Sequence, residues 1–282
     1  MSYEDYVKEQ VSKRDWRIIQ ELKDEGRINL DTGILTHFWT DFVKEEERRK
    51  TEIPFLLDQL KEYQCPKVFN SCLGSGTTTI GLIKAGIRNV VSNEIDDVFL
   101  RIAKKEAKKH GVRLGHITRY DWRELNEQLF DEFDCTLNLG NSLTYLFKEN
   151  DQIKALNNFW KTLKSNGKLI IDKRNYAELF LKGKGSSYRW TGEVVYCGID
   201  KVDAYPIYIS QTMVIMEYRH RKNGAKLNLV LYPWDEGELK EKLINAGFRK
   251  IKVYGNMAPE YKEEGQFDPR EPEFLTYVCR KI

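Results

Sequence analysis

The sequence has little that would indicate a metal-binding, disulfide-stabilised or membrane protein. Its five cysteines and four histidines show no paired short spacing of the kind that metal sites and disulfide frameworks use. No apolar run approaches the roughly 20 residues of a membrane helix, and the opening stretch MSYEDYVKEQ lacks the apolar core of a signal peptide. We therefore expect a cytoplasmic protein with no metal site and no membrane partner.

The chain also lacks an excess of charge of either sign. Lys and Arg number 46 and Asp and Glu number 43, so the net charge is only +3 over 282 residues. This balance argues against nucleic acid as a partner. The densest basic run, residues 104–113, is typical of the solvated face of a helix. With 41% hydrophobic residues, the chain can bury a sizeable core.

From residue 67 onward, short apolar runs alternate with amphipathic ones. The pattern predicts strands at 67–73, 89–95, 114–118, 133–140 and 167–173, and helices at 74–86, 96–111 and 151–167. Strands that alternate with helices form mostly parallel sheets covered on both faces, so we expect an α/β core. Residues 235–282 return to the same pattern, and their two strands are expected at the sheet edge.

Two further regions have a different pattern of apolar and polar residues. Residues 1–64 predict helices at 6–22 and 38–63. Residues 177–232 contain strand-like runs at 193–199, 208–221 and 225–234, and Asn223-Gly224 is a strong hairpin signal between the last two. The predicted organisation is a helical segment at 1–64, an α/β core at 65–176 and 233–282, and an antiparallel insert at 177–232.

A glycine turn after the first predicted strand is one candidate ligand site. Glycines at residues 74 and 76 would let the backbone approach a ligand closely. Glu94 ends the next strand, where a carboxylate can accept two hydrogen bonds from a ribose diol. Asp121 and Trp122 follow the third strand, where they could bond and cover an adenine ring. Glycine turns and strand-end acids also occur without ligands, so this pattern alone leaves a purely structural role open.

The turn itself narrows the class of ligand. Its sequence, GSGTTT, lacks the third glycine of the dinucleotide motif, which disfavours NAD. No Gly-Lys-Ser/Thr follows, so the chain has no phosphate-binding P-loop. S-adenosyl-L-methionine carries no phosphate and needs only the close turn.

A second candidate site lies where the fourth and fifth predicted strands end. LGNS and DKRNY both fall at the carboxyl edge of the sheet, so Asn141 and Arg174 can face each other. An arginine fork matches a carboxylate with two parallel hydrogen bonds. The alternative is that Arg174 only caps its strand by pairing with Asp172 or with a loop acid.

Together these stretches resemble the class I S-adenosylmethionine-dependent methyltransferases, and most specifically the glycine/sarcosine N-methyltransferases of betaine synthesis. The resemblance rests on FWTDFVKEEERR, VFNSCLGSG, LNLGNSLTYL, IDKRNY and LVLYPW. It implies a Rossmann-like fold with an antiparallel lid. It also implies methyl transfer from S-adenosyl-L-methionine to glycine and then to sarcosine, with S-adenosylhomocysteine as the product.

Three alternatives to this function stay open. Motifs do not count methyl groups, so the enzyme could act on sarcosine and dimethylglycine, or stop at sarcosine. A non-catalytic S-adenosylmethionine-binding regulator is the third. The sequence predicts no particular oligomeric state.

The resemblance also implies roles for individual residues. Eight residues are implied to contact S-adenosylmethionine: Trp39, Arg48, Cys72, Gly74, Glu94, Asp121, Trp122 and Leu139. Of these, Arg48 would lie near the methionine carboxylate. Those implied for the amino acid substrate are Asn141, Tyr145, Arg174, Tyr188, Tyr218 and Tyr232, of which Asn141, Arg174 and Tyr218 would be catalytic. The chain departs from the family pattern at four positions. An acid, a glycine, an aspartate and often a histidine are usual where this chain has Asn70, Cys72, Glu94 and Tyr145.

Overall fold

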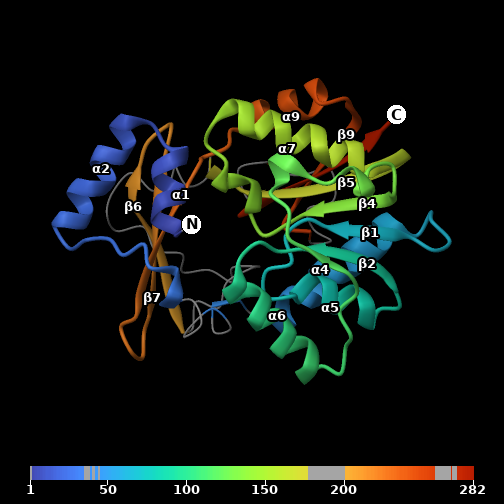
Figure 1. Cartoon of the computed structure of the whole chain (residues 1–282), viewed down its shortest axis with the longest axis horizontal. Coiled ribbons are helices and arrows are strands. Elements are labelled where there is room, and N and C mark those ends of the chain that lie inside the picture. The colour runs from blue at the N-terminus through green and yellow to red at the C-terminus, as the bar shows by residue number, and fades with distance from the viewer. Residues whose placement is uncertain are drawn as a thin grey trace.

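The computed structural model describes residues 2–34, 39, 42–43, 45–176, 201–257, 268 and 272–282, and it contains two sheets (Figure 1). The larger sheet has seven strands in the order β3-β2-β1-β4-β5-β10-β9. Its strands are β1 (Lys67–Asn70), β2 (Asn89–Asn93), β3 (Ile117–Thr118), β4 (Phe133–Asn138), β5 (Leu163–Arg174), β9 (Phe248–Gly255) and β10 (Phe274–Lys281).

The strands from β1 to β5 run parallel to one another, which confirms the predicted α/β class. β10 is antiparallel to both of its neighbours, β5 and β9. The expectation that both C-terminal strands lie at the edge is wrong for β10, because it inserts between β5 and β9. Of this C-terminal pair, β9 is the strand at the edge, and β3 forms the opposite edge of the sheet.

Helices cover both faces of the larger sheet. They are α4 (Glu45–Leu60), α5 (Thr77–Lys84), α6 (Asp97–Lys109), α7 (Glu149–Thr162) and α9 (Glu236–Asn245). Figure 1 shows α4, α5 and α6 on one side of the sheet and α7 and α9 on the other. Among the described residues, no helix has the length and apolar character needed to cross a membrane.

The smaller sheet is antiparallel and consists of β6 (Val202–Ile209), β7 (Val214–His220) and β8 (Lys226–Leu231). The predicted Asn223-Gly224 hairpin between β7 and β8 is confirmed, with Gly224 at φ 69°. The predicted strand at 208–221 is in fact two strands, because Ser210 Oγ accepts the backbone N–H groups of Thr212 and Met213 and turns the chain there. The predicted strand at 193–199 lies outside the described residues.

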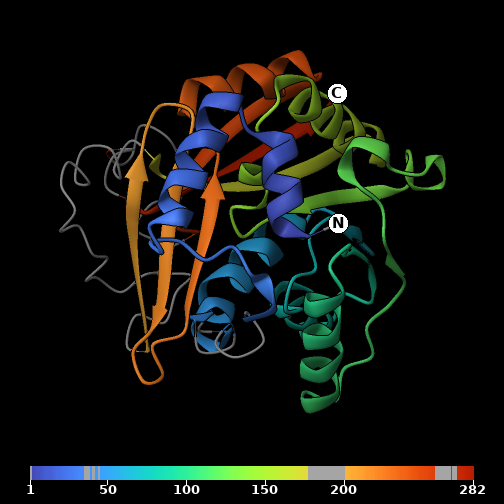
Figure 2. The ribbon, with the colours of Figure 1, turned by 60° about the vertical axis from the view of Figure 1, so that its left-hand side comes forward.

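The N-terminal helices α1 (Tyr3–Gln10) and α2 (Lys13–Asp24) pack on this smaller sheet, as Figure 2 shows. The chain breaks between them because Ser12 Oγ accepts the Asp15 N–H and caps α2, so the predicted single helix at 6–22 is two helices. The apolar residues buried in this contact include Val7, Ile19, Leu22, Met213, Ile215 and Val230. α4 packs instead on the core of the larger sheet. The division of the chain into three domains stays a prediction.

The helices α4 and α5 approach each other closely at Gly81. A Cβ atom on Gly81 would lie 2.5 Å from Ile53 Cδ1 and 2.6 Å from Ile53 Cγ1. Both residues are buried, so the Ile53 side chain has little room to move aside. Glycine is therefore retained in the helix for packing, against its low helix propensity.

We expect Gly81→Ala to destabilise the protein, although alanine favours a helix by about 1 kcal/mol. Overpacking typically costs about 1–3 kcal/mol, so the midpoint of urea unfolding should fall. In an Ile53→Ala background, Gly81→Ala should instead be neutral or stabilising, because the clashing atoms are gone. If Gly81→Ala in the wild-type background left the urea midpoint unchanged, α4 would be able to shift aside without a loss of stability.

Candidate active site

The first two strands of the parallel sheet bring the glycine turn and Glu94 together. Gly74 has φ 55°, and a Cβ atom on it would meet nothing within 4 Å, so the turn faces open space. Glu94 Oε2 accepts the Gly74 N–H at 2.8 Å, and Glu94 Oε1 accepts the Asp96 N–H at 2.9 Å. The carboxyl group therefore connects the turn to the start of α6.

Glu94 is also electrostatically perturbed. Burial of its carboxyl group raises the pKa of Glu94 to about 7, an effect that the two backbone N–H donors only partly offset. Hydroxyl groups of a ligand that donate to this carboxyl would stabilise its charged form. The site thus offers a half-buried acceptor whose charge a ligand can control.

Asp121 and Trp122 lie beside the same turn, at the short helix η2 (Trp122–Glu124). Trp122 Nε1 donates to the carbonyl of Ser71 at 2.8 Å, which ties the indole to the loop after β1. Both carboxylate oxygens of Asp121 accept from Arg123, Oδ1 from the Arg123 N–H at 2.8 Å and Oδ2 from Nη2 at 2.7 Å. Arg123, which is not among the sequence-based candidates, thus orients the acid predicted for adenine.

Arg48 of α4 lies between the first turn of α5 and the end of β4. Its Nε donates to Glu52 Oε2 at 2.6 Å, and its Nη2 is 3.5 Å from Thr78 Oγ1. A Cβ atom on Gly140 would lie 3.8 Å from Nη2. The guanidinium group is therefore near the ends of β1 and β4, where the sequence predicts the methionine carboxylate. Glu52, buried at 1% exposure, orients it.

Cys72 and Leu139 connect the loop after β1 to the loop after β4. Cys72 Sγ accepts the Leu139 N–H at 3.2 Å and lies 3.1 Å from the Leu139 carbonyl oxygen. Burial raises the pKa of the Cys72 thiol to about 11, which favours its neutral form. Trp39 packs 5.0 Å, centroid to centroid, from Phe99 of α6, close to the Glu94 end of β2.

The strand ends of β4 and β5 meet at Asn141. Asn141 has φ 60°, and its backbone N–H donates to Asp172 Oδ1 at 2.7 Å. Its Oδ1 accepts the Arg174 N–H at 2.8 Å, and its Nδ2 donates to Tyr176 Oη at 3.1 Å. The LGNS and DKRNY segments are therefore joined directly, as their position at the sheet edge predicts.

The Arg174 side chain is buried and already faces an acid. Its Nη1 donates to Glu273 Oε1 at 2.7 Å, and its guanidinium carbon lies 4.8 Å from the centre of the Phe274 ring. The loop-acid pairing that the sequence left as an alternative is thus present, with Glu273 just before β10. Because a guanidinium group has five N–H donors, it can serve a loop acid and a second carboxylate together.

The predicted substrate tyrosines lie in different surroundings. Tyr218 of β7 is buried, with its ring packed edge-on 4.7 Å from that of Phe42. Tyr232, just after β8, donates its hydroxyl to Glu238 Oε1 of α9 at 2.8 Å, so this group serves the contact with α9. Tyr188 lies outside the described residues.

Tyr145 faces the N-terminal helix. Its ring packs edge-on against Tyr3, with centroids 6.3 Å apart, and its carbonyl accepts the Tyr6 hydroxyl at 3.2 Å. Thr144 and Tyr176, which are absent from the sequence-based candidates, lie in the same two motifs and contact Asn141 directly or through each other. For Tyr176, its place in the DKRNY segment, two residues after Arg174 and just beyond the end of β5, is the signal that could have found it.

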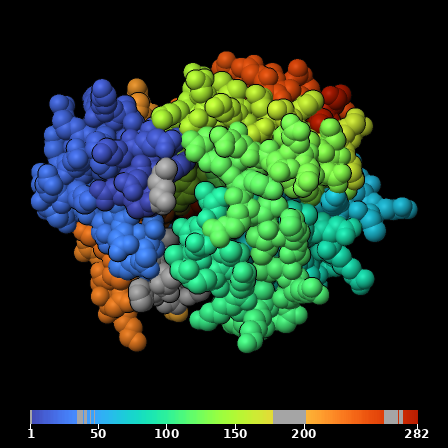
Figure 3. Space-filling model, viewed as in Figure 1, coloured from blue at the N-terminus to red at the C-terminus, as the bar shows by residue number. Residues whose placement is uncertain are grey.

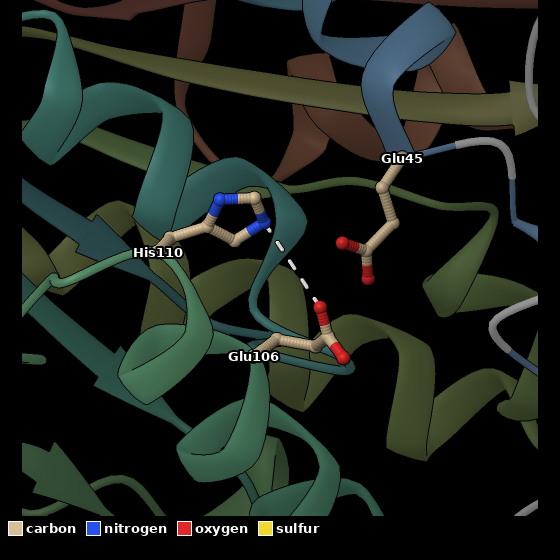
Figure 4. Close-up of side chains that lie close together, drawn as sticks. All are labelled: Glu45, Glu106 and His110. Atoms are coloured by element: carbon tan, nitrogen blue, oxygen red, sulfur yellow. Dashed lines mark ion pairs between the residues drawn. The ribbon is translucent and has the colours of Figure 1, made fainter.

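A cluster outside this site brings Glu45 of α4 toward Glu106 and His110 of α6 (Figure 4). One oxygen or nitrogen atom from each lies within 4.8 Å of the others, a proximity that residue spacing does not predict. Arg49 already supplies a cation, since its Nη2 donates to Glu45 Oε2 at 2.9 Å and its Nη1 is 3.2 Å from His110 Nε2. Burial, and next the charge of Arg49, lowers the pKa of His110. We therefore assign the cluster to holding α4 against α6.

Comparisons with known proteins bear on the family and the fold of the chain. No family model matches the chain. The chain is 30% identical over 246 residues to a glycine/sarcosine N-methyltransferase from Halorhodospira halochloris, a match that covers 86% of this chain and 85% of that protein. It is 32% identical over 246 residues to one from Parasynechococcus marenigrum strain WH8102, with 87% and 82% covered.

Solved structures show the same fold at lower identity. An S-adenosylmethionine-dependent methyltransferase from Clostridium acetobutylicum superposes with a TM-score of 0.64 at 14% identity, over 84% of this chain and 92% of that one. CalS10 from Micromonospora echinaspora, an amino pentose methyltransferase solved with S-adenosylmethionine bound, gives a TM-score of 0.59 at 15% identity, over 84% and 92%. With this class I methyltransferase fold and these relatives, the chain belongs to the glycine/sarcosine N-methyltransferase family.

Proposed function

We propose that this protein transfers a methyl group from S-adenosyl-L-methionine to the nitrogen of glycine and then to that of sarcosine, which are early steps of betaine synthesis. The observation that carries the proposal is the hydrogen-bonded contact of Asn141 with Arg174 at the ends of β4 and β5. This contact lies at the same sheet edge as the glycine turn and Glu94. The names of the relatives support the same reaction.

The residues on the β1–β2 side fit the methyl donor. Glu94 offers a carboxyl group for the two ribose hydroxyls, and the Gly74 turn leaves space for the methionine portion. Arg48 supplies a positive charge for the methionine carboxylate, and Trp39 and Trp122 offer aromatic surface around the adenosine. When bound, S-adenosylmethionine supplies an electrophilic methyl carbon on a sulfonium.

The residues on the β4–β5 side fit a small amino acid. Arg174 would hold the substrate carboxylate, and in glycine the amine is only one carbon away, so anchoring the acid also places the nitrogen. Positioning of this kind can supply up to roughly 7–11 kcal/mol of the barrier. The amine enters as a neutral lone pair. Tyr218 would stabilise the positive charge that develops on the nitrogen.

Mass spectrometry of products from glycine, sarcosine and dimethylglycine, each with excess methyl donor, tests this function directly. We expect sarcosine and dimethylglycine from glycine, and no product from dimethylglycine. Betaine from dimethylglycine would favour the sarcosine/dimethylglycine alternative. A product that stops at sarcosine would favour a single-step enzyme, and no product at all would indicate a regulator.

We expect Arg174→Lys to lower kcat/KM for sarcosine by an amount that corresponds to about 2–4 kcal/mol of lost transition-state stabilisation. Lysine keeps the positive charge but loses the two parallel N–H donors of the guanidinium group. Lysine can still pair with Glu273, so a purely structural Arg174 predicts nearly normal kinetics. Binding of S-adenosylmethionine, measured by calorimetry, should hardly change. Glycinamide keeps the amine and lacks the anion, so the wild-type protein should methylate it poorly.

Arg280→Lys is the matched control. Arg280 lies at the other end of β10 and pairs with Glu62 at 2.7 Å, so the same change is made in an ion pair away from the site. We expect this variant to keep wild-type kinetics. Methylation of glycinamide as fast as glycine would refute the carboxylate-binding role of Arg174.

Glu94 predicts a pH dependence of S-adenosylmethionine binding. If ribose hydroxyls donate to the charged carboxyl, its pKa of about 7 must fall on binding, and the affinity should drop about tenfold from pH 8 to pH 6. The Glu94→Gln variant should bind more weakly at pH 8 and show little of this dependence. Calorimetry in two buffers should detect proton release near pH 6.5 for the wild type only.

The ligand-free protein should show the opposite trend in stability. The pKa of Glu94 is raised from 4.5 to about 7 on folding. Its contribution to the free energy of unfolding is therefore fully present below the pKa of the unfolded state and is lost as the pH rises through the pKa of the folded state. Between pH 5 and pH 8 the melting temperature should therefore decline more for the wild type than for Glu94→Gln. Identical pH profiles for the two proteins would refute the raised pKa of the Glu94 carboxyl group.

A further inference from the structure

A continuous hydrogen-bond chain runs from Asn141 to the end of the smaller sheet. Asn141 Nδ2 is 3.1 Å from Tyr176 Oη, and Tyr176 Oη is 2.7 Å from Thr144 Oγ1. Thr144 Oγ1 is in turn 2.6 Å from the carbonyl oxygen of Tyr232. Asn141, Thr144 and Tyr176 are at most 9% exposed, so these bonds are shielded from competing water.

The donor and the acceptor of each hydrogen bond in this series follow from the groups at its two ends. The Tyr232 carbonyl can only accept, so Thr144 must give its single hydroxyl proton to it. Thr144 then has only lone pairs left for Tyr176, so the Tyr176 hydroxyl donates to Thr144. The Tyr176 oxygen is left as an acceptor and must face an N–H of the Asn141 amide.

The other end of the chain requires the same arrangement. The backbone N–H of Arg174 can only donate, and it lies 2.8 Å from the Asn141 Oδ1. The 3.4 Å approach of Tyr176 Oη to Asn141 Oδ1 is longer, and the only Tyr176 hydroxyl proton is already directed to Thr144. Both ends therefore set one orientation of the amide, with Oδ1 toward β5 and Nδ2 toward Tyr176.

We propose that Thr144 and Tyr176 are positioning residues for methyl transfer, because they hold the Asn141 amide in a single orientation toward the substrate. This inference rests on the proposed function, in which Asn141 contacts the amino acid. A fixed amide presents one defined donor and one defined acceptor. A rotated amide would exchange the two and leave buried partners unmatched.

Thr144 also couples this amide to the smaller sheet. The backbone N–H of Tyr232 donates to the Thr144 carbonyl at 2.8 Å, so Thr144 and Tyr232 are joined by two hydrogen bonds. Tyr232 directly follows β8, which pairs with β7, the strand that carries Tyr218. The chain thus links the orientation of Asn141 to the sheet that supplies the candidate substrate tyrosine.

Thr144→Val is the direct test, because valine has nearly the shape of threonine and lacks the hydroxyl. We expect kcat for sarcosine to fall about 10- to 100-fold, a range typical of misplaced reacting groups. Arg174 still holds the substrate carboxylate, so KM should change by less than about threefold. Each kcat is expressed per S-adenosylmethionine site counted by calorimetry, which removes any effect of unfolded protein.

Two variants control this measurement. Thr144→Ser keeps the hydroxyl and should stay within about threefold of the wild-type kcat if the hydrogen bond, and not the methyl group, is what matters. Thr136→Val removes an equally buried hydroxyl from β4, one that pairs with Thr162 Oγ1 at 2.7 Å, away from the site. That variant should keep the wild-type kcat.

An Asn141→Ala background shows whether Thr144 acts through the amide. There, Thr144→Val should cause no further loss, because the group that it positions is absent. A wild-type kcat for Thr144→Val, an equal loss for Thr144→Ser, or an undiminished effect in the Asn141→Ala background would each overturn the proposal.

A variant that does not fold and a wild-type protein without activity have different consequences. If Thr144→Val does not fold, Tyr176→Phe replaces it, with the same expected loss and the same dependence on Asn141, and a normal kcat would overturn the proposal. A wild-type protein that methylates neither glycine nor sarcosine would refute the proposed function itself. An active wild type with an unaffected Thr144→Val refutes only the positioning role.

Discussion

The structure of the site depends on one short contact, the hydrogen bond from the Arg174 N–H to Asn141 Oδ1. Parallel strands bring their carboxyl ends to the same edge, but they do not by themselves hold the following loops together. Here the Asn141 side chain completes the β4–β5 ladder beyond the last strand residue, while Asp172 binds the Asn141 backbone. The left-handed backbone of Asn141 is retained because three hydrogen bonds surround it.

Charges in this part of the molecule are buried in pairs. Arg48 faces Glu52, and Arg174 faces Glu273, with nearly all of these side chains shielded from water. An unpaired buried charge would cost several kcal/mol, so each arginine needs its acid. Such pairs keep the guanidinium groups in place. Glu94 differs from these pairs, because burial of its carboxyl group raises its pKa.

The hollow visible at the centre of Figure 3 lies between the N-terminal helices, in blue, and the green segments that belong to the larger sheet and its helices. Gln10 Nε2 of α1 donates to Asp151 Oδ2 of α7 at 3.1 Å, and residues of the smaller sheet share one buried apolar core with the larger sheet. Asp151 also accepts from Arg123, which binds Asp121. The N-terminal helices are thus connected to the predicted adenine end of the site, although they pack on the smaller sheet.

Local patterns in the sequence determined the elements of the larger sheet, its parallel character, the Asn223-Gly224 hairpin and the meeting of LGNS with DKRNY. Those features follow from residue periodicity and from the geometry of parallel strands. Only the tertiary structure decided that β10 enters between β5 and β9, that Glu273 pairs with Arg174, and that Thr144 and Tyr176 hold Asn141. These partners come from distant parts of the chain or depend on side-chain direction, and no spacing rule encodes either.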